Sequence, residues 1–492
     1  MTQILNPNSV MVALGVLQPA TTFEIIGFLR TMLPNAGELP GPDDILAFLK
    51  EREAVGHVLR VVRSDDHPSQ YALTLAGHRY LTVGQRRVRD KLRFYLLRDA
   101  HRARFRLSDE GAKRLVGASP TSDASLSIKG SVANKVGQRV PSGRPYWPRI
   151  ARQFDIRTGS SASSSDTFPE WLSFRNQRQC ELAADFDPND FELDFEGLAA
   201  CIGVSPKIIS QIANAPARHY RSFLIAKKSG DSREISSPRV FLRVIQWFLD
   251  DFILCHLPVH NAVNSFAYGR SVLTNALPHV GQPFVGTIDI EDFFGSVTDK
   301  SVLELLQSFG FRKHEATLIA ALTTKNGSLP QGAPTSAVLS NAVLYDFDEK
   351  LTLLCAASGA SYTRYADDIT ISAATRGEVS KCLAVARGML AKAGLRINES
   401  KTRISSQGSQ QNVTGVVVND RAQPSRLKRR RLRAKFHNAK LSESVTTKEI
   451  ASLRGHLSYM KMFPALAETR QVRRLEDDLT QIQRRAGLAE SS

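Results

Sequence analysis

The sequence predicts a multidomain α/β protein: a small α+β domain, a linker, a larger α/β body and a helical C-terminal region. Two observations lead to this prediction. In the body, strand-forming runs flank the adjacent acids Asp367 and Asp368, and a separate apolar run ends at Asp289. Near the N-terminus, three helical patterns precede two strand-like runs. The length of 492 residues exceeds a usual single domain, and a hydrophobic content of 42% is enough for a proper core.

The chain is strongly basic, with 65 basic and 48 acidic residues and a formal net charge of +17. This excess favours a polyanionic partner. The five cysteines are scattered without a CxxC pair, which predicts buried thiols rather than a disulfide framework or a zinc site. No apolar stretch has the length of a membrane span, and no Lys or Arg precedes Arg30, so a secretory signal is not expected. These features predict a cytoplasmic protein.

Residues 1–105 predict a separate small domain. The run SVMVALGVLQ is apolar and helical in character, Thr21 and Glu24 fit a capping box for a second helix, and Pro42 opens a third. The runs HVLRVVRS and SQYALTLAGHRYL predict two strands. Three helices followed by a hairpin is the order of a winged helix, and a docking domain without nucleic-acid contact is the alternative. The third helix is acid-rich, which argues against docking in a DNA major groove.

Residues 106–170 have the composition of a linker. The stretches GASPTSDASLSIKGS and RTGSSASSSDTFP are rich in Ser, Gly and Ala and poor in large apolar residues, which predicts flexibility. Between them, PSGRPYWPRIARQF is basic and aromatic. This segment would pack on the core or stack on single-stranded nucleic acid, and its composition leaves both possibilities open.

The run SYTRYADDITIS predicts a β-hairpin that holds Asp367 and Asp368 at its tip. Adjacent carboxylates at a strand turn suit Mg²⁺, because hard cations take carboxylate oxygens in near-octahedral geometry. A solvated hairpin turn is the alternative for this motif alone. Asp289 ends a second buried strand and supplies a third carboxylate, which favours a site for phosphoryl transfer. Asp292 lies off the alternation of that strand, and we interpret it as structural.

The ordered motifs of the body resemble those of reverse transcriptases, and several details resemble the bacterial retron branch. Two features narrow the resemblance to that branch: Asn275 and His279 fit its NAxxH pattern, and residues 413–415 form its VTG triplet. The resemblance covers about residues 190–420. The blocks that carry it are, in chain order, HYRSFLIAKKSGDSREISSPRVFLRVIQWFL, YGRSVLTNALPH, TIDIEDFFGSV, LPQGAPTSAVLSN, YTRYADDITIS, GLRINESKTRIS and VTGVVVN.

This resemblance implies an α/β right-hand polymerase preceded by a small winged-helix-like domain. Fingers and palm would occupy residues 171–425, and a helical thumb residues 426–492. Retron enzymes are typically shorter at the N-terminus, so the domain at 1–105 and the linker at 106–170 are additions here.

By the same resemblance, the acids hold two Mg²⁺ ions, for which Mn²⁺ can substitute. Asp289 and Asp367 would bridge the ions, with Asp368 in support and the Ile290 carbonyl as a further oxygen donor. One ion would activate the attacking hydroxyl, and the other would neutralise the leaving pyrophosphate.

The run IAKKSGDSREI has the form of a hairpin and is similar to the part of the fingers that clamps a nucleotide triphosphate. Arg233 and either Lys227 or Lys228 would contact the phosphates, Arg through its rigid fork and Lys as a point charge. Gln331 and Gly332 would lie at the nascent base pair, where the missing side chain of glycine lets the backbone approach.

Phe294 matches the position of an aromatic gate against the ribose 2′-hydroxyl, which implies dNTP substrates. Phe293, next to it, is expected in the core, although both residues are apolar and chemistry alone does not rank them. Lys401 occupies the place of a proton donor to pyrophosphate, with a surface lysine as the alternative.

The retron-type motifs imply recognition of a cognate structured RNA by Asn275, His279, Val413, Thr414 and Gly415. A satisfied buried histidine is the alternative for His279, and a bend in a strand is the alternative for the Thr-Gly pair. In the thumb, a dense basic run would bind the nucleic-acid backbone, although charge runs are usually solvated. Its central members are Arg429, Arg430 and Arg431.

The function that the resemblance implies is RNA-directed DNA synthesis on a cognate noncoding RNA, giving short branched RNA-linked DNA (msDNA). The partners would be that msr–msd type RNA, its cDNA, dNTPs and an effector or toxin protein, in a setting of antiphage defence. Two alternatives remain. One is a defence polymerase outside the retrons, protein-primed or untemplated; the other is a nucleic-acid-binding regulator or scaffold.

Overall fold

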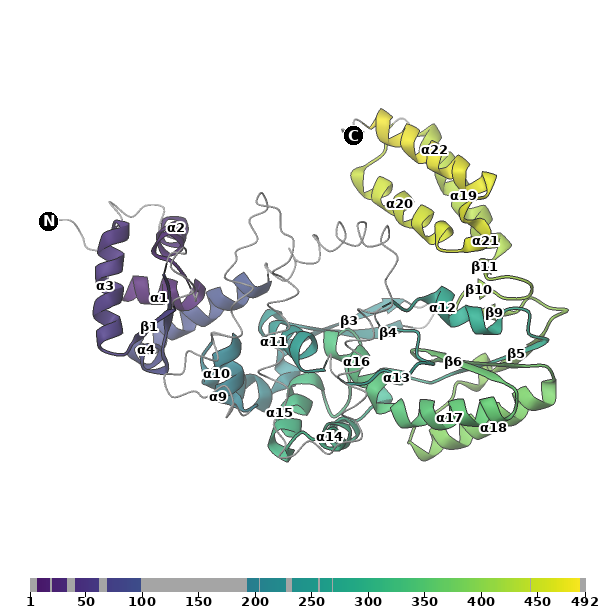
Figure 1. Ribbon diagram of the computed structural model, residues 1–492, viewed down its shortest axis with the longest axis horizontal. Helices are drawn as coiled ribbons and strands as arrows, with labels where there is room; N and C mark the ends of the chain where they lie inside the picture. The colour runs from purple at the N-terminus through teal and green to yellow at the C-terminus, as the bar shows by residue number, and fades with distance from the viewer. Residues whose placement is uncertain are drawn as a thin grey trace. The chain divides into compact units, whose positions relative to one another are not determined.

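The structure is a computed structural model that describes ten segments of the chain. They are residues 7–17, 20–32, 40–61, 69–98, 193–202, 204–226, 232–254, 257–267, 269–442 and 444–486. The chain forms two compact units (Figure 1). The first contains Met1–Leu257 and Thr298–Leu339, and the second contains Pro258–Val297 and Ser340–Ser492. Among the described helices, none has the length and apolar character needed to cross a membrane.

The N-terminal part of the first unit has the predicted order of three helices and a hairpin. The elements are α1 (Pro7–Leu17), α2 (Thr22–Met32), α3 (Pro42–Ala54), the antiparallel strands β1 (Val58–Val61) and β2 (Gln70–Leu73), and α4 (Leu75–Tyr80). The predicted capping box is confirmed: the Thr21 amide donates to Glu24 at 2.7 Å, and the Glu24 amide donates to Thr21 Oγ1 at 3.3 Å. Pro42 begins α3 as expected. The assignment as a winged helix stays a prediction.

A further helix, residues 83–98, ties this block to the helices that follow it in the unit. These are α9 (Phe195–Ile202) and α10 (Pro206–Asn214). The fully buried guanidinium of Arg93 donates to the carbonyls of Val16 at 2.6 Å and Ile202 at 3.0 Å. The ring of Phe94 stacks on Phe241 with centroids 4.5 Å apart. The N-terminal block therefore shares a core with the part of the unit that begins at residue 193.

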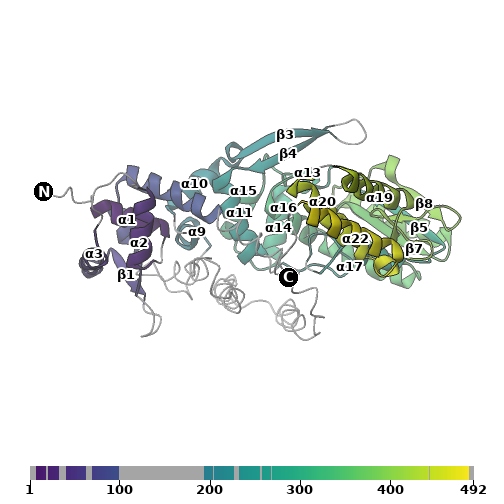
Figure 2. The same cartoon turned by 90° about the horizontal axis from the view of Figure 1, so that it is seen from above.

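The rest of the first unit contains a two-stranded antiparallel sheet, whose first strand is mostly exposed, together with several helices. Figure 2 shows its strands, β3 (Tyr220–Ala226) and β4 (Ser232–Pro238), side by side. The predicted hairpin is therefore present, although its turn, which contains Lys227, lies outside the described residues. Gln246 joins the hairpin to a neighbouring helix, since its amide donates to Tyr220 Oη and to the Leu322 carbonyl. The remaining elements are η1 (Pro216–His219), α11 (Val240–Phe252), α14 (Asp299–Ser308) and α15 (Lys313–Thr323), and α16 (Pro334–Val343) begins here and ends in the second unit.

The second unit is built on a four-stranded antiparallel sheet in the order β6-β7-β5-β8. The strands are β5 (Phe284–Asp289), β6 (Ser361–Tyr365), β7 (Asp368–Ala373) and β8 (Arg403–Ser406). Helices α17 (Tyr345–Ala357) and α18 (Arg376–Lys392) cover one face and bury the apolar side chains of the central strands (Figure 1). Gly286 permits this close packing, because a Cβ there would lie 2.6 Å from Val379 and 2.7 Å from Leu383.

A second core continues from the sheet into the C-terminal helices. It joins Val285 and Ala276 to Val413, Phe436 and Met460. The elements around it are α12 (Val272–Ala276), η3 (Leu277–His279), a small sheet of β9 (Asn412–Val413), β10 (Val416–Val417) and β11 (Gln423–Pro424), and the helices α19 (Arg426–Leu441), α20 (Thr447–Lys461), α21 (Pro464–Ala467) and α22 (Arg470–Arg485). Two short elements, α13 (Phe293–Ser296) and η4 (Glu399–Lys401), complete the unit. The predicted helical character of the C-terminal region is confirmed.

Candidate active site

The three predicted carboxylates lie at one end of the central strands. Asp289 is the last residue of β5 and pairs in register with Asp368, the first residue of β7. Ala366 and Asp367 form the turn between β6 and β7, and the Ile290 amide donates to the Asp367 carbonyl at 3.0 Å. The predicted hairpin and the predicted strand before Asp289 are therefore both present, and their pairing brings the acids together.

Lys401 reaches this cluster from η4. Its Nζ lies 2.7 and 2.9 Å from the two carboxylate oxygens of Asp289. The hydrogen bond to Asp289 raises the pKa of Lys401, and the charges of Asp367 and Asp368 add to the effect. The Asn398 amide donates to the Asp289 carbonyl at 2.8 Å, which fixes the approach of the segment that carries the lysine.

The pKa of one of these acids lies above its ordinary value, chiefly because the group is buried. Burial raises the pKa of Asp368 to about 6, and the charges of Asp367 and Asp289 contribute. Such a cluster of oxygen donors with excess negative charge has the chemistry that a divalent cation requires. Within the described residues, no three acidic, His or Cys side chains already converge on one ion position. Since Lys401 holds both oxygens of Asp289, a cation at that carboxylate has to displace the ammonium group.

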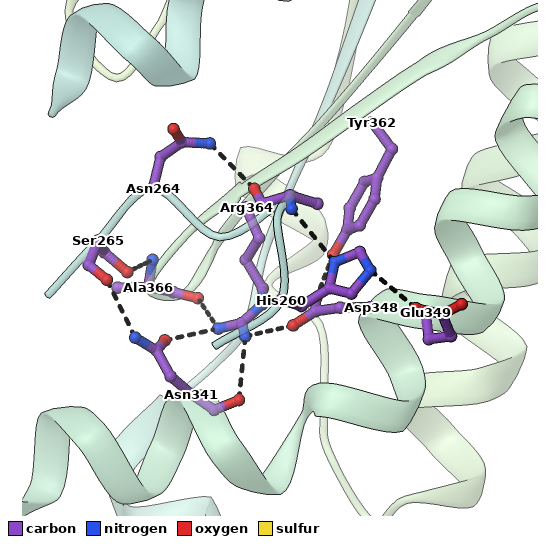
Figure 3. A network of polar contacts seen from close by, with 10 residues as sticks. His260, Asn264, Ser265, Asn341, Asp348, Glu349, Tyr362, Arg364 and Ala366 are labelled. Carbon is purple, nitrogen blue, oxygen red and sulfur yellow. Dashed lines mark hydrogen bonds and ion pairs between the residues drawn. The ribbon is translucent and has the colours of Figure 1, made fainter. Parts of the chain in front are cut away.

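A buried ion pair supports the turn that carries Asp367 (Figure 3). Arg364 on β6 donates to both carboxylate oxygens of Asp348 on α17, at 2.8 and 2.6 Å. Its Nη1 also donates to the Ala366 carbonyl and to Asn341 Oδ1, each at 3.2 Å. The guanidinium thus links the β6–β7 hairpin to the helices α16 and α17.

The same turn is held from its other side. The Ala366 amide donates to Ser265 Oγ at 2.7 Å, and Asn341 Nδ2 donates to the Ser265 carbonyl at 3.0 Å. Ala366 has a φ of 56°, in the left-handed region that a non-glycine residue enters at a cost. The hydrogen bonds on both of its backbone groups hold it there. Sequence reasoning missed Arg364, Asp348 and Ser265. Only Arg364 offered a signal, as a charged residue within a predicted strand.

The two adjacent phenylalanines after β5 differ in exposure. Phe293 is buried, with 4% of its surface exposed, whereas Phe294 is half-buried at the edge of the same core. Their ring centroids lie 5.4 Å apart. The expectation that Phe293 belongs to the core is met. Asp292, just before them, has a φ of 43°, and its carboxylate lies over Gly295, as suits the structural role expected of it.

Three of the residues expected at the nucleotide, Arg233, Gln331 and Gly332, lie in the first unit. Arg233 is exposed on β4, in register with Ile225 of β3. The Ser236 amide, also on β4, donates to the Gln331 carbonyl at 2.8 Å. Gly332 has a φ of 112°, and a Cβ there would lie 2.8 Å from the Ile235 side chain. The strand thus packs against the Gln331–Gly332 segment, where only glycine fits.

Asn275 and His279 are fully buried. His279 bonds through Nδ1 to Ser372 Oγ at 2.6 Å and through Nε2 to Thr363 Oγ1 at 2.8 Å. Burial lowers the pKa of His279 to about 3, so the ring is neutral. This geometry matches the alternative given for His279, a buried histidine whose two ring nitrogens are both hydrogen-bonded within the protein. The side chains of both residues therefore lie inside the second unit and present no surface to a partner in this structure.

The two retron-type motifs nevertheless meet. Asn275 Nδ2 donates to Thr414 Oγ1 at 3.4 Å. Thr414 and Gly415 form the turn between β9 and β10, with φ values of 47° and 83°, and the Gly415 amide donates to Asn412 Oδ1 at 2.8 Å. Val413 is buried, while Gly415 is exposed at the tip. The bend predicted as the alternative is thus a tight turn, anchored by the NAxxH segment.

The predicted basic run lies on α19. Arg430 and Arg431 are exposed, and Arg429 is half-buried. Lys428 places its Nζ 3.7 Å from the ring centroid of Tyr459 on α20, a cation–π contact. A basic side chain of α19 therefore lies against an aromatic ring of α20.

Comparison with known proteins gives a consistent pattern. Residues 225–418 match the family described as reverse transcriptase (RNA-dependent DNA polymerase). The chain is 36% identical over 296 residues to the retron Mx65 reverse transcriptase of Myxococcus xanthus, covering 56% of this chain and 69% of that protein. It is 35% identical to the retron Mx162 reverse transcriptase of the same organism, with 55% and 64% covered. It is 34% identical to the retron Ec86 reverse transcriptase of Escherichia coli, with 49% and 75% covered.

Solved structures show more distant likeness. A foamy viral protease–reverse transcriptase in complex with double-stranded DNA aligns with a TM-score of 0.33 and 16% identity, covering 54% of this chain and 44% of that one. A telomerase from Candida albicans aligns with a TM-score of 0.32 and 11% identity, covering 57% and 63%.

Proposed function

The chain belongs to the retron reverse transcriptases, which are RNA-directed DNA polymerases, and from this premise we propose that it copies part of its own structured RNA into short branched RNA-linked DNA. The observation that carries the proposal is the pairing of Asp289 with Asp368 beside the turn that holds Asp367. It gathers three carboxylates at the end of a sheet, as phosphoryl transfer requires.

Reverse transcriptase domains use divalent metal ions, and we propose Mg²⁺ for this chain. Asp289, Asp367 and Asp368 would hold two ions, with the Ile290 carbonyl as a further donor. When bound, such ions activate the primer hydroxyl and neutralise the leaving pyrophosphate. Lys401 would then be released from Asp289, and since lysine is ordinarily protonated at neutral pH, its ammonium group could donate a proton to the pyrophosphate.

The incoming nucleotide would be bound by groups of different chemistry. Arg233 and Lys227 would contact the triphosphate, and the backbone at Gln331 and Gly332 would approach the nascent base pair. Phe294 would lie under the deoxyribose, where its ring fills the space of a 2′-hydroxyl. The support for this assignment is its half-buried ring, beside the buried Phe293.

We further propose that the cognate RNA is contacted by the turn at Thr414 and Gly415 and by the basic residues Arg429, Arg430 and Arg431 of α19. Asn275, His279 and Val413 would act from the interior by holding that turn. A role in antiphage defence, with an effector or toxin protein as partner and the N-terminal block as effector or adaptor, follows from the family alone.

The double substitution Asp367→Asn with Asp368→Asn tests the proposal. It removes both charges of the turn and preserves the shape of the side chains. We expect cDNA to disappear while affinity for the copurified RNA stays nearly unchanged. Retained synthesis would refute the assignment of the acids. Treatment of the deproteinised product with a debranching enzyme tests the branched linkage: a retron product is cut, whereas a protein-primed or untemplated product is not.

A further inference from the structure

Phe266 has a backbone conformation that a bulky residue rarely adopts. Its φ is 53°, in the left-handed region, where a β-carbon is crowded by the neighbouring carbonyl. A residue held in this way costs of order 1–3 kcal/mol, and such residues gather at functional sites. Glycine would take the same conformation at no steric cost. The phenylalanine is therefore retained for its ring.

The residues before Phe266 are fastened to the catalytic hairpin. The Asn264 amide donates to the Arg364 carbonyl at 2.8 Å, and Val263 forms a parallel bridge with the same residue of β6. Ser265 accepts from the Ala366 amide and from Asn341, as described above. The segment thus runs along the edge of β6 to the turn that carries Asp367. The left-handed residue that follows sends the chain away from the strand.

This change of direction brings the ring of Phe266 to the proposed sugar gate. Its centroid lies 6.4 Å from that of Phe294, with the planes inclined by 49°, which is within the range of favourable aromatic pairs. More than half of its surface, 57%, is exposed. An exposed aromatic ring in a strained conformation has no packing reason to be there, since burial of apolar area is what normally stabilises such a side chain.

We propose that Phe266 is a positioning residue for sugar selection. Its ring fixes the orientation in which Phe294 meets the deoxyribose. The hydrogen bonds of Ser265 hold the Phe266 backbone, and through it the ring pair, at a fixed place beside the turn that holds Asp367. The proposal rests on the assignment of Phe294 as the gate. Beyond that assignment, we infer that selection between deoxyribose and ribose depends on the pair of Phe266 and Phe294, whose spacing is set by the hairpin of β6 and β7.

The test is single-nucleotide addition to a primed template by the full-length enzyme with its RNA. The quantity measured is the ratio of kcat/KM for a dNTP to that for the matching rNTP. We expect Phe266→Ala and Phe266→Gly each to lower this ratio by about threefold to tenfold, the range of an aromatic pair. Leu353→Ala, at an exposed apolar residue on α17 of the same unit, serves as the matched control and should leave the ratio unchanged.

Two further measurements separate the possible failures. Phe266→Gly relieves the left-handed strain, so its thermal midpoint should not fall below that of Phe266→Ala. If both Phe266 variants lose activity on the two nucleotides equally, the residue is only structural and the inference is overturned. Phe294→Val isolates the gate: a lowered ratio there, with a normal ratio in the Phe266 variants, overturns the inference and leaves the gate intact. A normal ratio in all of them overturns the gate and the inference together.

Discussion

Arg364 donates to both carboxylate oxygens of Asp348, and neither side chain has any exposed surface. Tyr362 donates to the same carboxylate at 2.6 Å. Two opposite charges are thus removed from water together, and the arginine uses its remaining donors on the Ala366 carbonyl and on Asn341. The ion pair is worth little as a source of net stability, but it fixes the shape of the turn that carries the catalytic acids.

Asp348→Ala should destabilise the protein strongly, because it leaves the Arg364 charge buried without a partner. We expect a loss of about 3–5 kcal/mol in the free energy of unfolding, measured by urea denaturation. The matched control is Glu399→Ala, which breaks the exposed ion pair with Arg387 and should cost less than about 1 kcal/mol. Equal losses in the two variants would show that the buried pair has no special role.

Phe293→Ala should cost stability without changing sugar selection. The ring is buried in the palm core, so its removal leaves a cavity, and we expect a loss of about 3–5 kcal/mol in unfolding experiments. Phe294→Ala should instead raise ribonucleotide incorporation more than it lowers dNTP use. If Phe293→Ala loosens sugar selection and Phe294→Ala merely unfolds the enzyme, the assignment along this segment is wrong by one residue.

Asp368→Asn should stabilise the enzyme in a chelating buffer above pH 6. The pKa of Asp368 is raised to about 6 from an ordinary 3.8. The protonated carboxyl therefore contributes to the free energy of unfolding fully below pH 3.8, and this contribution is lost as the pH rises through 6. The variant lacks this loss, which amounts to about 3 kcal/mol at pH 8. Thermal unfolding at pH 4 and pH 8 measures the difference.

Added Mg²⁺ should reverse that order, because the wild-type carboxylate gains a cation and the amide does not. Asp420→Asn, at an exposed acid, is the control and should behave as the wild type at both pH values. A variant that stays more stable than the wild type in saturating Mg²⁺ would argue against metal binding at Asp368.

His279→Gln should make stability less sensitive to acid. The pKa of His279 is lowered to about 3 from 6.5, so the histidine contributes stability above pH 6.5 that is lost as the pH falls toward 3. We expect the variant to be less stable at pH 8, since Ser372 and Thr363 lose their partner, but to lose less between pH 6.5 and pH 4. His437→Gln, at an exposed histidine on α19, should leave the pH profile unchanged. Parallel profiles for the wild type and His279→Gln would contradict this prediction.

Arg430→Gln with Arg431→Gln should weaken RNA binding in a salt-dependent way. If both arginines contact phosphates, the slope of log affinity against log salt concentration should fall by roughly 1.5, because each contact releases most of one counterion. Filter binding at several salt concentrations measures the slope. Arg473→Gln with Arg474→Gln, two exposed arginines on α22, removes the same charge as a control. A similar change of slope in both double variants would mean that α19 has no specific role.

Local patterns were sufficient to predict the strands and the turn at the acids. Alternating β-branched and aromatic residues flank Asp367 and Asp368, and the hairpin follows from them within a few residues. The pairing of Asp289 with Asp368 needed the order of the family's motifs, since no local signal joins residues so far apart in sequence.

Contacts between residues far apart in the sequence could not be predicted from the sequence alone. The hydrogen bond between Asn275 and Thr414 spans 139 positions, so the two retron-type motifs looked independent. Phe293 and Phe294 have the same chemistry, and only their exposure distinguishes them. Phe266 gave no signal at all, because a left-handed φ is a property of the folded backbone.

The arginine that joins the N-terminal helix bundle to the rest of its unit limits how this chain can be cut and recombined. Arg93 satisfies carbonyls of both α1 and α9, and the masking of those groups from water depends on having both helices present. Ser205, just before α10, is also bonded to this block, since it accepts from Arg89 and its amide donates to Asp90. A chimera that exchanged only residues 1–98 would bring a foreign surface to Ile202 and Ser205. The smallest segment that can be exchanged between enzymes of this type therefore extends from the N-terminal block through α9 and the first turn of α10.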